Sequence, residues 1–226
     1  MINKYIVASS KNWFKKTSKS NQYNKLNIIN ITNQKDLNIS KLKKIDPKYI
    51  FFPHWNWKIN SEIYNNFECI GFHTSPLPYG RGGSPIQNMI IRNFKESPVC
   101  AFRITEILDS GPIYDSKKIS LEGKISEIFL RIAKSIEQMI IKICINNPKP
   151  VEQKGQVVSF KRLKYSDNKL LNTFSLKEIY NRIRMVDGED YQKAYLLFGS
   201  YKIEFSESSL VKGELYARVK LFKNDD

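Results

Sequence analysis

Several features that define other protein classes are absent or scarce in this 226-residue sequence. Only three cysteines occur, Cys69, Cys100 and Cys144, and they are widely spaced among apolar residues. This odd number and spacing predict reduced core thiols, with neither a disulfide framework nor a metal site. No apolar run approaches the ~20 residues of a membrane-spanning helix, and residues 1–7 lack the apolar core of a signal peptide. We therefore expect a cytoplasmic protein without a bound metal.

Two glycine-rich motifs that bind nucleotides are also missing. No G-x-G-x-x-G follows the first predicted strand, residues 4–9, and G-x-x-x-x-G-K-[ST] occurs nowhere. The sequence thus gives no support for a nicotinamide or ATP cofactor. Ser9, Ser10 and Lys11 instead lie at the carboxyl end of this strand, where they would bind a substrate phosphate or sugar hydroxyl, or form only a solvated turn.

The residues that are present give a globular composition with excess positive charge. Hydrophobic residues make up 41% and aromatic residues 12% of the chain, which is typical of a folded protein with one main domain and a smaller appendage. The net charge of +15 favours phosphate-bearing partners, from tRNA to a nucleotide diphosphate. Most of the excess is Lys, accompanied by abundant Asn and Ile, which an AT-rich genome also produces without such selection.

Apolar runs and helical patterns alternate over the first 150 residues. The predicted strands cover residues 4–9, 26–32, 49–53, 68–72 and 99–107. Their alternation with helices predicts an α/β fold with a doubly wound, mostly parallel sheet. Apolar residues at helical spacing then predict a long helix from Ile125 to Ile143, and Asn146 to Pro150 looks like a linker. We therefore expect a catalytic domain over residues 1–150.

The remaining residues, 151–226, predict a small α+β appendage. Residues 175–186 form an amphipathic pattern that opens with Ser175, a residue able to cap a helix. Residues 201–205 and 215–222 alternate apolar and polar side chains, as in half-exposed antiparallel strands. These exposed strands would allow a homodimer. Arg184 is expected to lie on the surface of the predicted helix.

The central stretch runs from Ile70 to Arg92. His73 ends a short apolar run and precedes a loop rich in proline and glycine, which we expect to contain neither strand nor helix. A helical pattern begins after Pro85. Because ligands bind beyond the carboxyl ends of parallel strands, His73 is either a catalytic group or a structural hydrogen-bonding residue.

Two further strand ends carry polar or aromatic residues. The run over residues 99–107 leads to Asp109 in a tight turn, so we expect the imidazole and this carboxylate to meet from two strand ends. The third predicted strand runs directly into His54-Trp55-Asn56-Trp57. The two indoles either belong to the core or form a stacking platform for a flat heterocycle.

The segments F-H-T-S-P-L-P-Y-G-R-G-G-S-P-I-Q and L-D-S-G-P-I together resemble the paired motifs of the folate-dependent formyltransferases. Their order and separation are similar, and a weaker likeness covers most of the chain. The short length and the F-P-H-W-N-W segment look most like the sugar N-formyltransferases of polysaccharide biosynthesis. The resemblance implies a Rossmann-like core and N10-formyltetrahydrofolate as co-substrate.

The resemblance also implies roles for individual residues. His73 and Asp109 match the catalytic His and Asp of the family, the first as a base and the second as its partner. Residues expected beside the folate are Trp55, Trp57, Thr105, Glu106, Ile107 and Leu108. Residues expected beside the acceptor, in addition to the N-terminal loop, are Thr74, Ser75, Arg81, Gly82 and Gly83. Arg184 matches the Arg of an Ile-Arg-Ala helix found in several members.

The sequence departs from the family pattern two residues before His73. The family usually has an Asn there that stabilises the oxyanion, whereas this chain has Gly71. Loss of one oxyanion donor typically lowers the rate by about 10²- to 10³-fold. We expect His54 and Asn56 to compensate as catalytic residues from the neighbouring strand end. Gly83 is a second departure, because some sugar N-formyltransferases carry an Arg at this position.

These observations predict a formyltransferase that acts on the amine of an amino sugar, nucleotide-linked and used in lipopolysaccharide or polysaccharide biosynthesis. A methionyl-tRNA formyltransferase is the first alternative, which the positive charge would suit. The second alternative is a folate- or nucleotide-binding module impaired in catalysis, and Gly71 is its best support. Binding of tRNA would fall steeply with ionic strength, which separates the first two possibilities.

Overall fold

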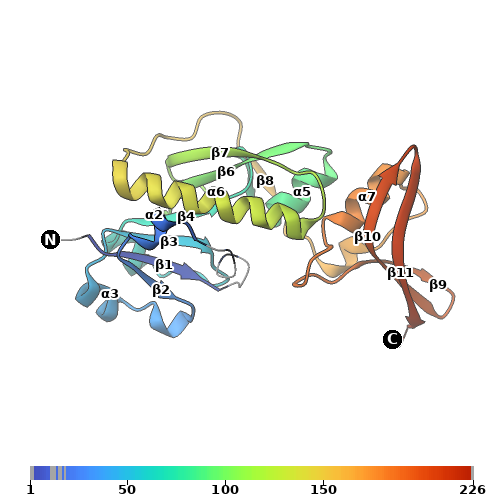
Figure 1. Cartoon of the computed structure of the whole chain (residues 1–226), viewed down its shortest axis with the longest axis horizontal. Coiled ribbons are helices and arrows are strands. Elements are labelled where there is room, and N and C mark those ends of the chain that lie inside the picture. The colour runs from blue at the N-terminus through green and yellow to red at the C-terminus, as the bar shows by residue number, and fades with distance from the viewer. Residues whose placement is uncertain (1–2, 11–13, 15–16, 18, 225–226) are drawn as a thin grey trace. The chain divides into compact units, whose positions relative to one another are not determined.

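The structure, a computed structural model, describes residues 3–10, 14, 17 and 19–224 (Figure 1). Its chain forms two compact units that interleave along the sequence. Unit 1 comprises Met1–Gly82, Pro98–Ile119 and Leu130–Ser159. Unit 2 comprises Gly83–Ser97, Ser120–Phe129 and Phe160–Asp226. The predicted division at residue 150 stays a prediction.

A six-stranded sheet forms the centre of unit 1, in the order β2-β1-β3-β4-β6-β7. The strands are β1 (Tyr5–Ser9), β2 (Ile28–Ile31), β3 (Tyr49–His54), β4 (Cys69–His73), β6 (Glu96–Arg103) and β7 (Ile113–Ser120). The first four in sequence pair in parallel, and β6 pairs antiparallel to β4. The α/β class and the mostly parallel sheet are therefore confirmed.

Short helices connect the parallel strands because each crossover must return the chain to the same edge. These are α2 (Asn21–Asn24), the 3₁₀ helix η1 (Gln34–Asp36), α3 (Ile39–Ile45) and α4 (Ser61–Asn66). At the start of α3, the Asn38 side chain accepts a hydrogen bond from the Lys41 N–H, while Leu42 is fully buried. Leu42 packs with Ile6 and Ile50 in the core beneath the sheet, which holds β1 and β3 in place.

The helix α6 (Ile125–Asn146) matches the predicted long helix and runs beside the strands of unit 1 from residue 130 onward (Figure 1). The Tyr5 hydroxyl of β1 donates to the Cys144 carbonyl, and Lys142 forms an ion pair with Asp115 of β7. Buried Glu137 accepts from the Ser20 N–H with an N···O distance of 2.7 Å. These contacts place α6 against both the first and the last strand, in sequence order, of the six-stranded sheet.

Two predictions about the central segments are wrong. The proline- and glycine-rich loop contains the strand β5 (Tyr79–Gly82), which pairs with β8 (Val158–Phe160). The Val158 N–H donates to the Pro78 carbonyl at this pairing. In addition, β6 ends at Arg103, which lies opposite Ile70 at the start of β4. Its carboxyl end therefore does not share an edge with His73.

Unit 2 is built around an antiparallel sheet of three strands in the order β11-β10-β9. Its elements are α5 (Pro85–Ile91), η2 (Tyr165–Asn168), α7 (Leu176–Arg184), β9 (Ala194–Phe198), β10 (Tyr201–Val211) and β11 (Glu214–Lys223). The predicted α+β character and the Ser175 cap are confirmed, because Ser175 accepts from the Glu178 N–H. Helix α7 packs against β10.

Arg184 differs from its predicted surface position. Only 8% of the residue is exposed, and its guanidinium donates to the carbonyls of Leu121 and Gly123 and to the Asn181 side chain. Burial lowers the pKa of the Arg184 guanidinium. This Arg therefore joins α7 to the segment that precedes α6 in unit 2.

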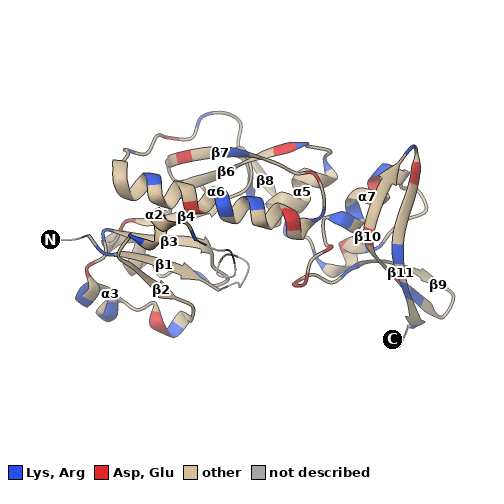
Figure 2. Ribbon diagram, viewed as in Figure 1, with Lys and Arg blue, Asp and Glu red and all other residues tan. Residues whose placement is uncertain are grey.

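Within the described part of the chain, no helix is long and apolar enough to cross a membrane. The same residues contain no group of three or more His, Cys, Asp or Glu side chains placed to hold a metal ion. The lysines are concentrated in the N-terminal part of the chain, where residues 1–60 carry twelve Lys and two Asp. Three of these lysines, Lys41, Lys43 and Lys44, are exposed on α3 (Figure 2).

Candidate active site

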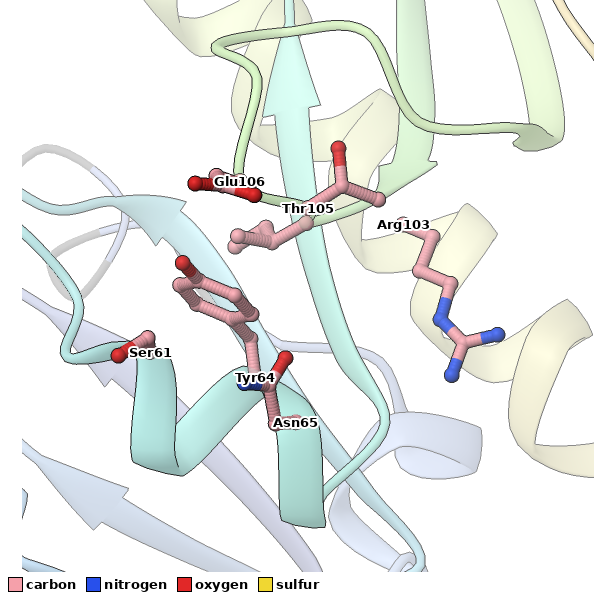
Figure 3. A pocket seen from close by; sticks show the side chains of 7 residues that line it. Ser61, Tyr64, Asn65, Arg103, Thr105 and Glu106 are labelled. Carbon is pink, nitrogen blue, oxygen red and sulfur yellow. The ribbon is translucent and has the colours of Figure 1, made fainter.

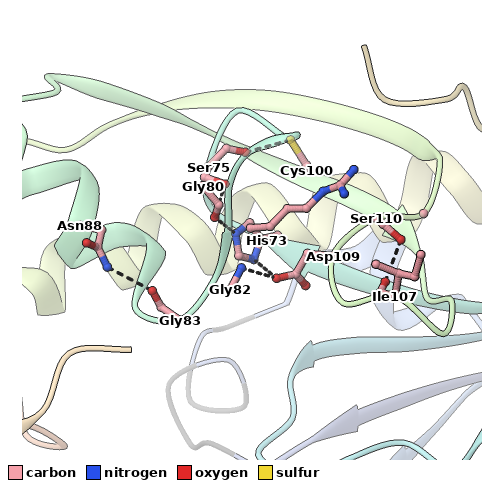
Figure 4. A network of polar contacts seen from close by, with 12 residues as sticks. His73, Ser75, Gly80, Gly82, Gly83, Asn88, Cys100, Ile107, Asp109 and Ser110 are labelled. Carbon is pink, nitrogen blue, oxygen red and sulfur yellow. Dashed lines mark hydrogen bonds and ion pairs between the residues drawn. The ribbon is translucent and has the colours of Figure 1, made fainter. Parts of the chain in front are cut away.

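His73 is the last residue of β4 and is 6% exposed. Its Nε2 atom lies 2.7 Å from the Gly80 carbonyl oxygen, and its Nδ1 atom lies 3.4 Å from Asp109 Oδ2 (Figure 4). Both ring nitrogens therefore contact groups of unit 1. The predicted meeting of His73 and Asp109 is present in the structure.

Asp109 reaches His73 by a different route from the one expected. It lies in the connection between β6 and β7, six residues beyond the end of β6, and has a left-handed backbone with φ of 53°. The Gly82 N–H donates to Asp109 Oδ2 at 2.9 Å, next to the contact with His73 (Figure 4). A folded loop, and not a second strand end, therefore delivers the carboxylate.

The hydrogen bonds restrict how the pair can share protons. A carbonyl oxygen only accepts, so His73 Nε2 carries the hydrogen in its contact with Gly80. A neutral ring then turns the lone pair of Nδ1 toward Asp109, whereas a doubly protonated ring donates to both neighbours. The contact between His73 and Asp109 is favourable when one proton lies between Nδ1 and Oδ2.

The segment from Ser75 to Gly82 holds both members of the pair. Gly80 and Gly82 have φ of 85° and 102°, in the region that favours glycine. The Gly80 carbonyl accepts from His73 and also from the Ser75 hydroxyl at 3.1 Å. Cys100 Sγ lies 3.4 Å from the Ser75 carbonyl oxygen. The predicted acceptor residue Ser75 is fully buried and uses its hydroxyl within this segment.

Gly71 is coupled to a residue on the neighbouring strand. A Cβ at this position would lie 2.8 Å from Cζ and 2.9 Å from Cε1 of Phe102, and 3.3 Å from Ile104 Cγ1. The Phe102 ring therefore fills the space into which a side chain at residue 71 would project. This steric relation, which the sequence did not reveal, accounts for the glycine.

His54 ends β3 as His73 ends β4. Phe52 of β3 pairs with Gly71 of β4. His54 and His73 lie two residues beyond Phe52 and Gly71, so both histidines are at the same edge of the sheet. The His54 carbonyl accepts from the Ser10 N–H at 2.9 Å and from the Ser10 hydroxyl at 3.2 Å. Asn56, two residues further on, is exposed. Compensation for Gly71 by His54 and Asn56 stays a prediction.

Trp55 and Trp57 occupy different environments. The Trp55 ring packs on the core cluster beneath the sheet, with its centroid 5.9 Å from that of Phe52 and 4.9 Å from that of Trp57. Trp57 is 38% exposed. Trp55 Nε1 is buried and has no hydrogen-bond partner among the described residues. Trp55 therefore packs on the core, as one of the two alternatives expected, and a platform role for the exposed Trp57 stays a prediction.

A cavity of about 400 Å³ opens beside the connection from β6 to β7 (Figure 3). It is lined by Ser61, Tyr64, Asn65, Arg103, Ile104, Thr105 and Glu106. Two of these, Thr105 and Glu106, were predicted to bind the co-substrate. The three residues from α4, together with Arg103 and Ile104, were missed, although α4 begins only four residues beyond Trp57.

The other predicted binding residues are spread over several environments. Ile107 and Leu108 are 68% and 70% exposed, which is unusual for aliphatic side chains. Ser9 is 2% exposed within β1, and Thr74 is half-buried. Lys11 lies outside the described residues. The binding roles of these residues stay predictions.

Gly83 begins unit 2 and is closely packed. Its N–H donates to the Phe160 carbonyl, and a Cβ at this position would lie 2.5 Å from the Arg162 Cα atom. The structure therefore has no room for the Arg that some sugar N-formyltransferases carry here. Arg81, two residues earlier, contacts Gln153 in unit 1.

Comparison with solved structures identifies the family. The fold matches a methionyl-tRNA formyltransferase from Clostridium thermocellum with a TM-score of 0.91 and 37% sequence identity, over 98% of this chain and 100% of the other. The chain belongs to the folate-dependent formyltransferase family. Residues 165–222 of this chain also match the family model described as methionyl-tRNA formyltransferase, C-terminal domain.

Other members of the formyltransferase family match over shorter lengths or at lower identity. The methionyl-tRNA formyltransferase of Campylobacter lari is 34% identical over 166 residues, which cover 70% of this chain and 54% of that protein. The chain thus spans about half the length of the curated relatives it matches. A sugar N-formyltransferase from Shewanella sp FDAARGOS_354 is 15% identical, with a TM-score of 0.63 over 96% of this chain and 97% of the other. This last match shows the shared fold alone.

The comparisons confirm the predicted family. The predicted preference for sugar N-formyltransferases is narrower than what they support, because the relatives with higher identity are named methionyl-tRNA formyltransferases.

Proposed function

We propose that this protein transfers the formyl group of N10-formyltetrahydrofolate to a primary amine on a phosphate-bearing acceptor. The contact between His73 Nδ1 and Asp109 Oδ2, built into a formyltransferase fold, is the observation that carries this proposal. It places a proton-carrying ring and a carboxylate in one site at the end of β4. A formyl transfer to an amine requires such a group, because the attacking nitrogen must lose a proton.

The described residues fit a folate co-substrate. The cavity lined by Thr105 and Glu106 has a volume of about 400 Å³, within the usual range of small-molecule sites. Its polar lining offers hydroxyl, amide, carboxylate and guanidinium groups to the many polar atoms of a pterin. When bound, the folate supplies the formyl group.

We assign the two members of the pair different tasks. The Asp109 side chain is 12% exposed and that of His73 is 7% exposed, so the carboxylate is the more accessible group. His73 Nε2 is bound to the Gly80 carbonyl, which fixes the ring and directs Nδ1 toward Asp109. The carboxylate would accept the proton of the amine, in place of the imidazole expected from the sequence, while His73 holds the carboxylate through Nδ1. The Gly82 N–H stabilises the same oxygen.

Two acceptors are supported by different observations. The 37% identity over almost the whole chain favours methionyl-tRNA. The motif resemblance and the aromatic segment after β3 favour a nucleotide-linked amino sugar of polysaccharide biosynthesis. Both acceptors carry an amine and phosphates, and the lysine-rich N-terminal part of the chain would attract either one.

The test is an assay of the full chain with N10-formyltetrahydrofolate and each acceptor class. One arm contains a panel of nucleotide-linked amino sugars and the other contains methionyl-tRNA. Mass spectrometry reads the gain of one formyl group, and His73→Asn is the control for the chemistry. Raising the salt concentration should weaken acceptor binding far more for tRNA than for a nucleotide sugar, since the number of phosphate contacts differs.

Each outcome has a defined meaning. Formylation in one arm that is lost in His73→Asn supports the reaction and selects the acceptor. Absence of formylation in both arms, together with retained folate binding, would contradict the proposal and favour the impaired binding module.

A further inference from the structure

Gln153 lies in the segment before β8 and uses both ends of its side-chain amide. Its Nε2 atom donates to the carbonyls of Asp109 and Gly111, at 2.8 and 2.9 Å. Its Oε1 atom accepts from Nε and Nη2 of Arg81, at 3.2 and 2.7 Å. A single half-buried side chain therefore connects the arginine of β5 with the turn that carries the candidate catalytic carboxylate.

The turn at Asp109 needs such support. Asp109 has φ of 53°, a conformation that a residue with a side chain keeps only when its surroundings impose it. On one side, the Ser110 hydroxyl and the Thr105 hydroxyl both donate to the Ile107 carbonyl. Those bonds fix the start of the turn. They do not involve the carbonyls of Asp109 and Gly111, which accept hydrogen bonds from Gln153.

The position of the turn is also restricted by packing. A Cβ at Gly111 would lie 1.9 Å from the Arg103 carbonyl oxygen, so the backbone passes directly against the end of β6. Gly111 cannot move closer to the end of β6, so it cannot compensate for a small rotation of the Asp109 peptide. Gln153 thus bridges two carbonyls whose mutual orientation sets the direction of the Asp109 side chain.

We propose that Gln153 is a positioning residue, which aims the Asp109 carboxylate at His73 by fixing the Asp109 peptide against Arg81. This inference rests on the proposed function, because it assigns Asp109 the role described above. Gln153 also connects two residues that were assigned different roles. Arg81 was predicted to contact the amine substrate, and through Gln153 it contacts the backbone of Asp109, the proposed proton acceptor.

The chemistry of the contacts requires an amide. The two carbonyls need a donor, and the guanidinium needs an acceptor, and only a neutral amide of this length offers both. A glutamate would keep the bond to Arg81 but would place a carboxylate oxygen against two carbonyl oxygens. A methionine would have a similar length and would lose all four bonds.

The first test compares Gln153→Glu and Gln153→Met with the wild-type full chain in the formyl-transfer assay. Gln156→Glu is the matched control, since Gln156 is exposed three residues away. We expect kcat to fall about 100-fold in both Gln153 variants, as a catalytic group displaced by about 1 Å would cause. In Gln153→Glu, KM should change less than about threefold, because this variant keeps the bond to Arg81 and with it ground-state binding. The Gln156→Glu variant should keep wild-type values.

The second test does not depend on activity. Hydrogen exchange of the Gly82 amide, followed by NMR, reports its bond to Asp109 Oδ2. Exchange should be about 10-fold faster in both Gln153 variants and unchanged in Gln156→Glu. If no formyl transfer is found even in the wild type, the proposed function fails, whereas faster exchange at Gly82 still supports the positioning of Asp109.

A third comparison uses the Asp109→Ala background, in which adding Gln153→Glu should reduce kcat by less than about twofold. The proposal is overturned by wild-type kcat and wild-type Gly82 exchange in the Gln153 variants. A full additional loss of kcat in the Asp109→Ala background would also overturn it. Failure of both Gln153 variants to fold would overturn the proposal as well, because Gln153 would then act on the stability of the whole protein.

Discussion

Replacement of Gly71 by the asparagine that is usual in the family should destabilise this protein. The Cβ atom alone would meet two carbons of the Phe102 ring at 2.8 and 2.9 Å, which real Cβ contacts essentially never show. Overpacking of this kind costs about 1–3 kcal/mol. The buried amide group would add about 1–3 kcal/mol unless it finds hydrogen-bond partners. We therefore expect Gly71→Asn to lower the free energy of unfolding by about 2–5 kcal/mol.

A double-mutant cycle with Phe102→Ala tests the cause. Removal of the Phe102 ring should cost about 3–5 kcal/mol because it leaves a cavity in the core. The double variant Gly71→Asn/Phe102→Ala should be more stable than the sum of the single effects by about 2 kcal/mol, since the new side chain occupies the vacated space. Gly71→Ala separates the clash of the Cβ atom from the effect of the amide and should cost about 1–3 kcal/mol.

Urea denaturation followed by circular dichroism measures all four variants. The coupling between residues 71 and 102 is the decisive quantity. A Gly71→Asn variant within 0.5 kcal/mol of the wild type, or strictly additive effects in the double variant, would refute the view that Phe102 excludes a side chain at this position.

Three further outcomes are expected. Arg184→Leu should lower the free energy of unfolding by about 2–4 kcal/mol, measured by thermal denaturation, because the buried carbonyl of Leu121 and the partly buried carbonyl of Gly123 lose their donor. Burial raises the pKa of the Cys69 and Cys144 thiols to about 12. Alkylation of these thiols by iodoacetamide at pH 8 should therefore be about 10³-fold slower in the folded protein than in the urea-unfolded chain. Equal alkylation rates in the two states would contradict this expectation. His54→Ala and Asn56→Ala should each reduce kcat for formyl transfer by about 10-fold or more if they compensate for Gly71, and wild-type rates in both would exclude that role.

Local sequence patterns correctly predicted most elements of the fold. The spacing of apolar residues predicted the long helix, found as α6 (Ile125–Asn146), and the alternation of strands and helices predicted the mostly parallel sheet. Ser175 was correctly predicted as a helix cap. These features depend on side chains close together in the sequence, so their pattern is visible without the fold.

Strand direction and strand pairing could not be obtained in the same way. The run at residues 96–103 has the composition of a strand in either direction, and only pairing with β4 shows that it is antiparallel. The loop after His73 was predicted to be irregular because of its glycines and prolines, yet β8 pairs with Tyr79–Gly82 some 80 residues earlier in the chain. Hydrogen bonds between distant segments leave no periodic signal in either one.

The sequence by itself determined the family and the identity of its two most informative polar residues, because the motifs around His73 and Asp109 are specific in order and spacing. Only the tertiary structure decided how these residues are held. The bridge through Gln153 and the packing of the Phe102 ring against Gly71 each join parts of the chain that lie more than 25 residues apart. The left-handed conformation of Asp109 depends on a backbone torsion. Such contacts arise only when the sheet brings separate segments together, and for this reason the sequence pattern could not show them.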